Sequence, residues 1–220
     1  EIIIKLAPIG AFGYISWVVG TQGLDILKAL AMLVATLVIA CIFQYLIFGV
    51  FILFVARLNP IPFYKKILFT QSIAFATSSS KATLSTALDQ LQNRLGVSKS
   101  NSNFLLPLGV CINMDGTAVY QAIAAVFIAQ TFGLDLSITA QLGIIVTATL
   151  ASIGAAAVPS AGIIVLVIVL AQAGIPEAGL ALIFAVDRPL DMCRTVVNIT
   201  GDATVSMIVD IPNKIEKKII

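Results

Sequence analysis

The side chains best suited to bind a charged ligand lie in one short stretch, residues 187–202, inside otherwise apolar sequence. This stretch carries three carboxylates, two guanidiniums and an asparagine. At about 3.6 residues per turn, five of these residues share one helix face: Asp187, Asp191, Arg194, Asn198 and Asp202. Because one ionised side chain at a bilayer centre costs roughly 2.5–3.5 kcal/mol, a buried stripe of this kind predicts a site that binds something charged.

Asp191 and Arg194 are complementary to the two ends of a zwitterion. The carboxylate can hold an ammonium group, and the guanidinium can take a carboxylate in a bidentate fork. Asn198 and Asp202, one and two turns further along, would complete a cation site. The alternative is a self-neutralised Asp191–Arg194 pair without a ligand. Asp187 and Arg188 lie nearer the end of the segment, where structural ion pairing is expected.

The composition is that of an integral membrane protein. Hydrophobic residues make up 59% of the 220 residues and charged residues 11%, whereas a soluble domain carries about 25% charged residues. The apolar composition predicts a lipid bilayer as partner, and the formal net charge of +2, from 13 basic and 11 acidic residues, predicts no nucleic-acid partner. The chain has no histidine, the commonest proton relay and transition-metal ligand, and no nucleophile–base pair that would indicate an enzyme.

Two pairs of half-length apolar helices are expected, at residues 60–96 and 137–174, and each helix falls short of the ~20 residues that cross a bilayer. The first pair flanks a serine-rich tip at residues 77–80, and the second a glycine-rich tip at residues 152–162. Irregular backbone at membrane depth persists only where it is buried in protein or lines a wet cavity. We interpret both as re-entrant hairpins. The first tip would contact a ligand or merely cap the turn, and the second would be a mobile flap or a rigid turn.

Three longer segments are expected to span the membrane: residues 24–58, 103–132 and 176–209. An Asn-Met-Asp-Gly-Thr motif at residues 113–117 breaks the second of them, and its oxygen donors suit an alkali cation. A kink with Asp115 tied to a neighbouring helix is the alternative. The order hairpin, span, hairpin, span predicts an inverted repeat. Basic residues near the first hairpin and in the C-terminal tail place both in the cytoplasm: Arg57, Lys65, Lys66, Arg94, Lys99, Lys214, Lys217 and Lys218.

Four motifs resemble, in order, those of the sodium-coupled glutamate/aspartate (dicarboxylate/amino acid:cation) symporter family. They are the serine-rich tip, Asn-Met-Asp-Gly-Thr, Ala-Ser-Ile-Gly with Val-Pro-Ser-Ala-Gly, and Asp-x-x-Arg-Thr-x-x-Asn-x-x-Gly-Asp. The resemblance covers Ala7 to Val209 and looks like the C-terminal half of a member. It implies an all-α integral membrane fold, with two re-entrant helical hairpins and two broken transmembrane helices in inverted repeat, as an elevator-type transport domain.

The resemblance also implies a division of the chain and its setting. Residues 1–23 would be the end of a scaffold helix, residues 24–212 the transport domain and residues 213–220 a basic cytoplasmic tail. The protein would be a multi-pass homotrimer of the plasma membrane.

By the same resemblance, the residues that contact an acidic amino acid would be Ser79, Met114, Thr117, Asp191, Arg194, Asn198 and the backbone of Val158. Asp191 would take the amino group and Arg194 the side-chain carboxylate. Sodium ions would be held at three places: by Gly109, Asn113, Asn198 and Asp202, by Asn113 and Asp115, and by the carbonyls of Ser152 and Ile153. Gln121 stands where proton-coupled animal members carry a glutamate, so no proton cotransport is expected.

Residues and resemblance together predict a secondary active symporter that moves aspartate or glutamate with sodium ions by an elevator-like alternating-access mechanism. A symporter of C4-dicarboxylates is an alternative, but it would leave Asp191 without an ammonium group to hold. A symporter of neutral amino acids would leave Arg194 without a carboxylate. An ion channel lined by the same polar stripe is the alternative from a different class.

Overall fold

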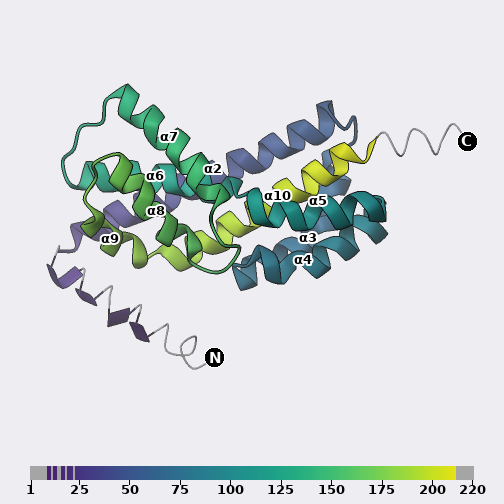
Figure 1. Ribbon diagram of the computed structural model, residues 1–220. Helices are drawn as coiled ribbons and strands as arrows, with labels where there is room; N and C mark the ends of the chain where they lie inside the picture. The colour runs from purple at the N-terminus through teal and green to yellow at the C-terminus, as the bar shows by residue number, and fades with distance from the viewer. Residues whose placement is uncertain (1–8, 11, 14–15, 18, 22, 212–220) are drawn as a thin grey trace, which may run out of the picture.

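The computed structural model describes residues 9–10, 12–13, 16–17, 19–21 and 23–211. The expected scaffold-helix end at residues 1–23 is therefore covered only in part, and the expected tail at residues 213–220 lies outside the described residues. The described residues form helices joined by turns and loops. They make an elongated bundle in which α10, Asp187–Val209, runs through the middle (Figure 1).

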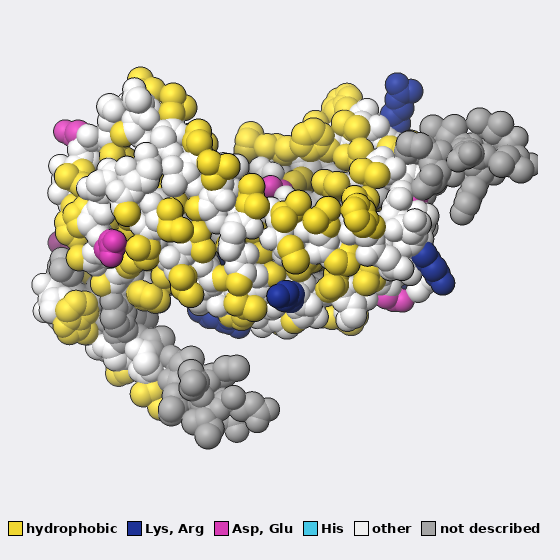
Figure 2. Space-filling model, viewed as in Figure 1, with side chains coloured by type: hydrophobic (Ala, Val, Ile, Leu, Met, Phe, Trp, Pro, Cys, Tyr) yellow, Lys and Arg dark blue, Asp and Glu magenta, His cyan; other side chains and the backbone are white. Residues whose placement is uncertain are grey.

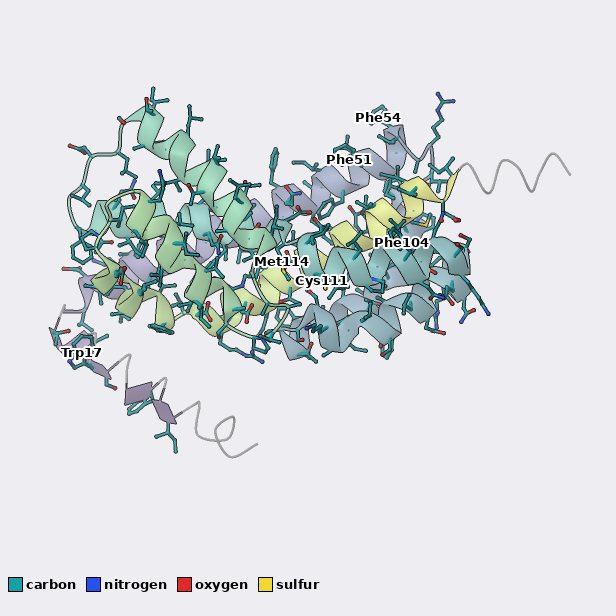
Figure 3. All side chains as sticks on the ribbon, viewed as in Figure 1. Trp17, Phe51, Phe54, Phe104, Cys111 and Met114 are labelled. Carbon is teal, nitrogen blue, oxygen red and sulfur yellow. The ribbon has the colours of Figure 1, made fainter. Side chains whose placement is uncertain are left out.

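Two helical segments of the described chain are long and apolar enough to cross a membrane. One is α2, Asp25–Phe54, whose mean hydropathy reaches 2.7, and the other is the stretch Lys99–Thr131. Hydrophobic side chains cover much of the face shown in Figure 2, and Phe51 and Phe54 project outward from α2 (Figure 3). Exposed apolar surface on this scale fits a molecule surrounded by lipid and further apolar protein.

Residues 60–94 form a pair of helices around the serine-rich tip. Helix α3, Pro60–Thr77, starts at Asn59, whose side chain accepts from the Ile61 amide, and ends where Ser78 turns left-handed with φ 51°. Ser79 then caps α4, Ser80–Asp89, by accepting from the Ala82 amide at 3.2 Å. A π-helical turn, Gln90–Arg94, continues α4. Ser79 therefore does cap this turn, and the re-entrant position of the turn in a membrane stays a prediction.

The next four helices form a broken segment and a second pair. Helices α5, Lys99–Ile112, and α6, Asp115–Thr131, are separated at Asn113 and Met114, where the backbone is not helical. This break lies within the Asn-Met-Asp-Gly-Thr motif. Helices α7, Ile138–Ile153, and α8, Ala161–Gln172, are joined by the glycine-rich tip and pack on each other and on α6.

Residues 176–209, expected as the final span and one of the two broken helices, are interrupted near their start. They form a 3₁₀ turn, Glu177–Gly179, then α9, Leu180–Phe184, and only then α10. The separation falls at Ala185 and Val186, four and three residues before Pro189. Proline lacks an amide hydrogen and its ring clashes with the carbonyl four residues earlier, so Pro189 fits the first turn of α10 and prevents a continuous helix.

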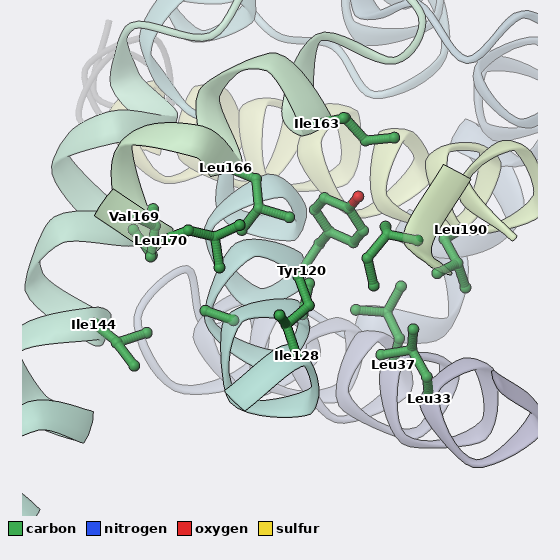
Figure 4. Packing of buried hydrophobic residues seen from close by; sticks show 14 of the residues in the cluster. Leu33, Leu37, Tyr120, Ile128, Ile144, Ile163, Leu166, Val169, Leu170 and Leu190 are labelled. Carbon is green, nitrogen blue, oxygen red and sulfur yellow. The ribbon is translucent and has the colours of Figure 1, made fainter. Parts of the chain in front are cut away.

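Buried apolar residues form two clusters that α10 joins. The first lies among α2, α6, α7 and α8, where Tyr120 of α6 is surrounded by Leu37, Leu166 and Leu190 (Figure 4). The second lies among α2, α3, α4 and α5, and includes Met114. Helix α10 contributes apolar side chains to both. Its polar face is therefore enclosed between the two halves of the molecule.

Candidate functional site

The polar stripe on α10 is buried along its whole length. Its five members are between 1% and 4% exposed: Asp187, Asp191, Arg194, Asn198 and Asp202. The helical periodicity of the sequence thus placed them correctly on one face. Charges buried to this extent need partners close by, because an uncompensated buried ion costs several kcal/mol.

Arg194 lies between two carboxylates and an aromatic ring. Its Nε donates to Asp191 Oδ1 at 2.8 Å, and its Nη1 is 3.3 Å from Asp187 Oδ1. The guanidinium carbon lies 4.1 Å from the centre of the Tyr120 ring, and the Tyr120 hydroxyl donates to Asp187 Oδ1 at 3.2 Å. Neither Nη1 nor Nη2 has a hydrogen-bond partner among the described residues. The guanidinium is thus held by Nε and by the ion pair through Nη1, and its remaining donors could bind an anion.

Asp187 is the ion-pair partner that the sequence suggested near the end of the stripe. Arg188 is different, because its side chain is exposed. The expected Asp191–Arg194 contact is present, but it uses only the Nε of Arg194. The contact with Asp191 therefore leaves other donors of Arg194 for a ligand.

The tip between α7 and α8 covers the two carboxylates. The Ser160 amide donates to Asp191 Oδ2 at 2.7 Å, and the Ser160 hydroxyl donates to Asp187 Oδ2 at 2.8 Å. Two residues on, a Cβ at Gly162 would lie 2.9 Å from the guanidinium carbon of Arg194. Only glycine permits such a close approach of the backbone.

The two tips meet directly over this region. The Ser79 hydroxyl donates to the Ala157 carbonyl at 2.9 Å, which joins the α3–α4 turn to the α7–α8 turn. Both turns lie beside α10 near the middle of the molecule (Figure 1). Ser78 and Ser80, at 2% and 3% exposure, line the space beneath, and the Ser78 hydroxyl has no described partner.

The break between α5 and α6 supplies the third wall. Asn198 Oδ1 accepts from the Gly116 amide at 2.8 Å, and Asn198 Nδ2 lies 3.3 Å from Thr117 Oγ1 and 3.4 Å from Met114 Sδ. A Cβ at Gly116 would lie 2.5 Å from the Arg194 carbonyl oxygen, so α6 and α10 touch through their backbones here. Met114 is seen near the middle of the molecule in Figure 3.

These three walls enclose a cavity of about 20 Å³, which is room for about one water molecule. The lining comprises Ser78, Ser80, Met114, Thr117, Ala155, Ala156, Ala157, Val158, Ala161, Gly162, Asp191, Arg194, Thr195 and Asn198. Six of the seven expected substrate contacts are among them. Ser79 is the exception, because its hydroxyl bonds to the opposite tip. An amino acid would enter only after a tip moves.

A second polar group lies further along α10. Asn113 Nδ2 donates to Asp202 Oδ1 at 2.8 Å, while Asp202 Oδ2 has no described partner. Gly109 permits this approach, since a Cβ there would lie 2.5 Å from Asp202 Oδ1. Asp115 Oδ2 and the Asn113 amide both pack against Gly201. A buried, half-partnered carboxylate with a second carboxylate nearby fits a hard cation such as sodium.

The remaining expected cation ligands are placed elsewhere. The hydrogen bonds of Asn198 go to the cavity residues Gly116, Thr117 and Met114. Ser152 and Ile153 lie at the end of α7, where the Ser152 hydroxyl bonds to Thr149 of its own helix and the Ser152 carbonyl accepts from the Ala155 amide. A sodium ion held by the carbonyls of Ser152 and Ile153 stays a prediction.

Sequence reasoning missed three residues that hold the site together: Tyr120, Ser160 and Gly162. Tyr120 follows Thr117 by one helical turn, so the spacing could have predicted that both residues share one helix face. Ser160 and Gly162 belong to the Val-Pro-Ser-Ala-Gly motif, but nothing in the sequence shows which part of α10 that tip would meet.

A larger groove lies away from the stripe. It has a volume of about 720 Å³ and lies between α2, α6 and α7. Its lining contains no charged side chain: Ala29, Met32, Leu33, Thr36, Ala122, Ile123, Val126, Phe127, Gln130, Thr131, Gln141, Ile144 and Ile145. Size alone would favour this groove, but the chemistry of a charged ligand favours the small cavity on α10.

Comparison with known proteins gives consistent similarities along the whole chain. A model described as the sodium:dicarboxylate symporter family matches residues 1–211. The chain is 37% identical over 212 residues to the proton/sodium-glutamate symport protein of Bacillus subtilis (strain 168), covering 94% of this chain and 48% of that protein. It is 41% identical over 220 residues to excitatory amino acid transporter 3 of Mus musculus, covering 99% and 42%. The chain thus spans about half the length of these relatives and aligns with their C-terminal portion.

Proposed function

The chain belongs to the sodium:dicarboxylate symporter family, a family of membrane transporters and not of enzymes, and we propose that its site binds an acidic amino acid together with sodium ions. The observation that carries this proposal is the Arg194 guanidinium. It is 1% exposed, lies between Asp187 and Asp191, and neither Nη atom has a hydrogen-bond partner among the described residues at the cavity. A buried fork of this kind matches a carboxylate.

The substrate's two charged ends would meet complementary groups on α10. Its amino group would bind Asp191, which Ser160 and Arg194 already orient. Its side-chain carboxylate would bind Arg194, while Thr117 and Asn198 supply polar contacts on the α6 side. The names of the relatives, a glutamate symport protein and an excitatory amino acid transporter, support this choice of substrate.

Sodium would enter as a cosubstrate at the Asp202 group. Asp202 Oδ2 is buried without a described partner, and Asn113, Asp115 and Gly109 surround it. Sodium there would offset the carboxylate and stabilise the break at Asn113 and Met114. Since Met114 lines the cavity, cation binding and substrate binding are linked through one segment of backbone.

Alternating access would follow from movement of this helical bundle. The tips of the two helix pairs approach the cavity from different parts of the molecule and meet at the bond from Ser79 to Ala157. We propose two re-entrant hairpins in inverted repeat, moving together as an elevator within a homotrimer of the plasma membrane, with the C-terminus in the cytoplasm. The second hairpin would act as the flap.

Sodium dependence is the first expected result. In isothermal titration of the full-length protein, the affinity for aspartate should rise about tenfold per tenfold increase in sodium for each coupled ion, because the bound cations offset buried negative charge. Choline chloride at equal ionic strength is the control. Equal affinity in sodium-free buffer would contradict the proposal.

Arg194→Cys tests the substrate class. Removal of the guanidinium should lower aspartate uptake by proteoliposomes at least tenfold, because a hydrogen-bonded charge contributes about 1.5–3 kcal/mol, and neutral amino acids such as serine should become better substrates. Arg188→Cys, on the same helix but exposed, is the matched control.

Retained uptake of C4-dicarboxylates by Asp191→Asn, together with loss of aspartate uptake, would favour the dicarboxylate alternative. Large currents independent of substrate would favour a channel.

A further inference from the structure

Resting on the proposed function, we propose that Ser160 is a positioning residue that latches the α7–α8 tip to α10 and thereby lowers the apparent affinity for substrate. The Ser160 amide binds Asp191 and its hydroxyl binds Asp187. One residue thus ties the tip to both carboxylates that flank Arg194. Of these, Asp191 is the group that the amino end of the substrate needs.

The backbone at Ser160 is held in an unfavourable conformation by these bonds. Its φ of 61° is left-handed, a region that residues other than glycine rarely adopt. Such conformations persist where surrounding contacts determine them. The two hydrogen bonds to α10, together with the close approach of Gly162 to Arg194, supply these contacts.

The latch and the substrate compete for the same space. The cavity beneath the tip, about 20 Å³, holds about one water molecule, so an amino acid enters only when the tip lifts from α10. Lifting the tip breaks the Ser160 hydroxyl bond to Asp187. The apparent affinity for a ligand falls with the fraction of molecules in the binding-competent state, so this bond acts against binding.

Ser160→Ala isolates the hydroxyl, because alanine keeps the amide and the Cβ. A hydrogen bond to a charged acceptor corresponds to about a tenfold change in the opening equilibrium. The reporter is Ala155→Cys, at a cavity-lining position that is 5% exposed. In detergent and choline chloride, without sodium or amino acid, Ser160→Ala should raise its rate of maleimide labelling about tenfold.

The controls separate opening of the tip from general loosening. All variants carry Cys111→Ser, because Cys111 is an exposed native cysteine. Gly154→Cys, at an exposed position of the same tip that does not line the cavity and has room for a Cβ, should label at the same rate with or without the hydroxyl. Ser160→Gly should label between the parent and Ser160→Ala, since glycine loses the hydroxyl but relieves the left-handed backbone in the closed tip.

Two results would overturn the latch: equal labelling of Ala155→Cys in the parent and in Ser160→Ala, or faster labelling in Ser160→Gly than in Ser160→Ala. A further measurement distinguishes the latch from a bond that also holds the closed, substrate-bound tip. Stopped-flow binding should show a faster association rate in Ser160→Ala, whereas faster dissociation alone would also overturn the proposal. If aspartate with sodium fails to protect the reporter in the parent, the proposed function fails while the labelling result stands.

Discussion

Gly116→Ala should abolish sodium-dependent aspartate binding and lower the melting temperature of the protein. A Cβ at this position would lie 2.5 Å from the carbonyl oxygen of Arg194 and 2.9 Å from its Cα. Both are backbone atoms of α10, so no side chain can rotate away, and α6 and α10 must separate. Overpacking costs about 3 kcal/mol at the upper end of its usual range, which corresponds to a factor of roughly a hundred.

The separation would also break the site itself. The Gly116 amide donates to Asn198 Oδ1, so moving α6 disorders the wall formed by Thr117 and Met114. Gly143→Ala is the matched control, because a Cβ there would lie 3.4 Å from the Gln172 side chain, an ordinary contact. That variant should keep its binding and melting temperature. Unchanged affinity in Gly116→Ala would show that α6 and α10 do not touch here.

Asp202→Asn should lower the affinity for sodium at least a hundredfold. Two unit charges at 4 Å attract by about 4 kcal/mol at an effective dielectric constant of 20, and asparagine keeps the shape of the side chain without its charge. In the parent, sodium should raise the melting temperature, because a ligand that binds only the folded state stabilises it. In Asp202→Asn this rise should be strongly reduced.

The sodium-free state gives a second, opposite readout for the same variant. Asp202 is 2% exposed, and its Oδ2 has no described partner. Removing this charge should therefore raise the melting temperature in choline chloride above that of the parent. Asp135→Asn, in an exposed loop, should change neither value. A sodium-induced rise as large in Asp202→Asn as in the parent would place the cation elsewhere.

Much of the architecture was predictable because it depends on local sequence. The break at Asn113 and Met114 and the capping by Ser79 follow from residues that are neighbours along the chain. The resemblance implied two broken spans, but the position of the division between α9 and α10 was not predicted, although Pro189 indicated it. The large apolar content also indicated membrane helices, and the family match agrees with this.

The sequence by itself determined that charged groups would share one buried face of α10, because helical periodicity and the cost of burying charge act on a single segment. It also determined where the two tips lie along the chain, because each tip is a short run of neighbouring residues. Only the tertiary structure decided which groups meet: Ser160 reaches Asp187 across 27 residues, and Tyr120 reaches it across 67. Such pairings depend on how whole helices pack against each other, and no local preference of the chain encodes that packing.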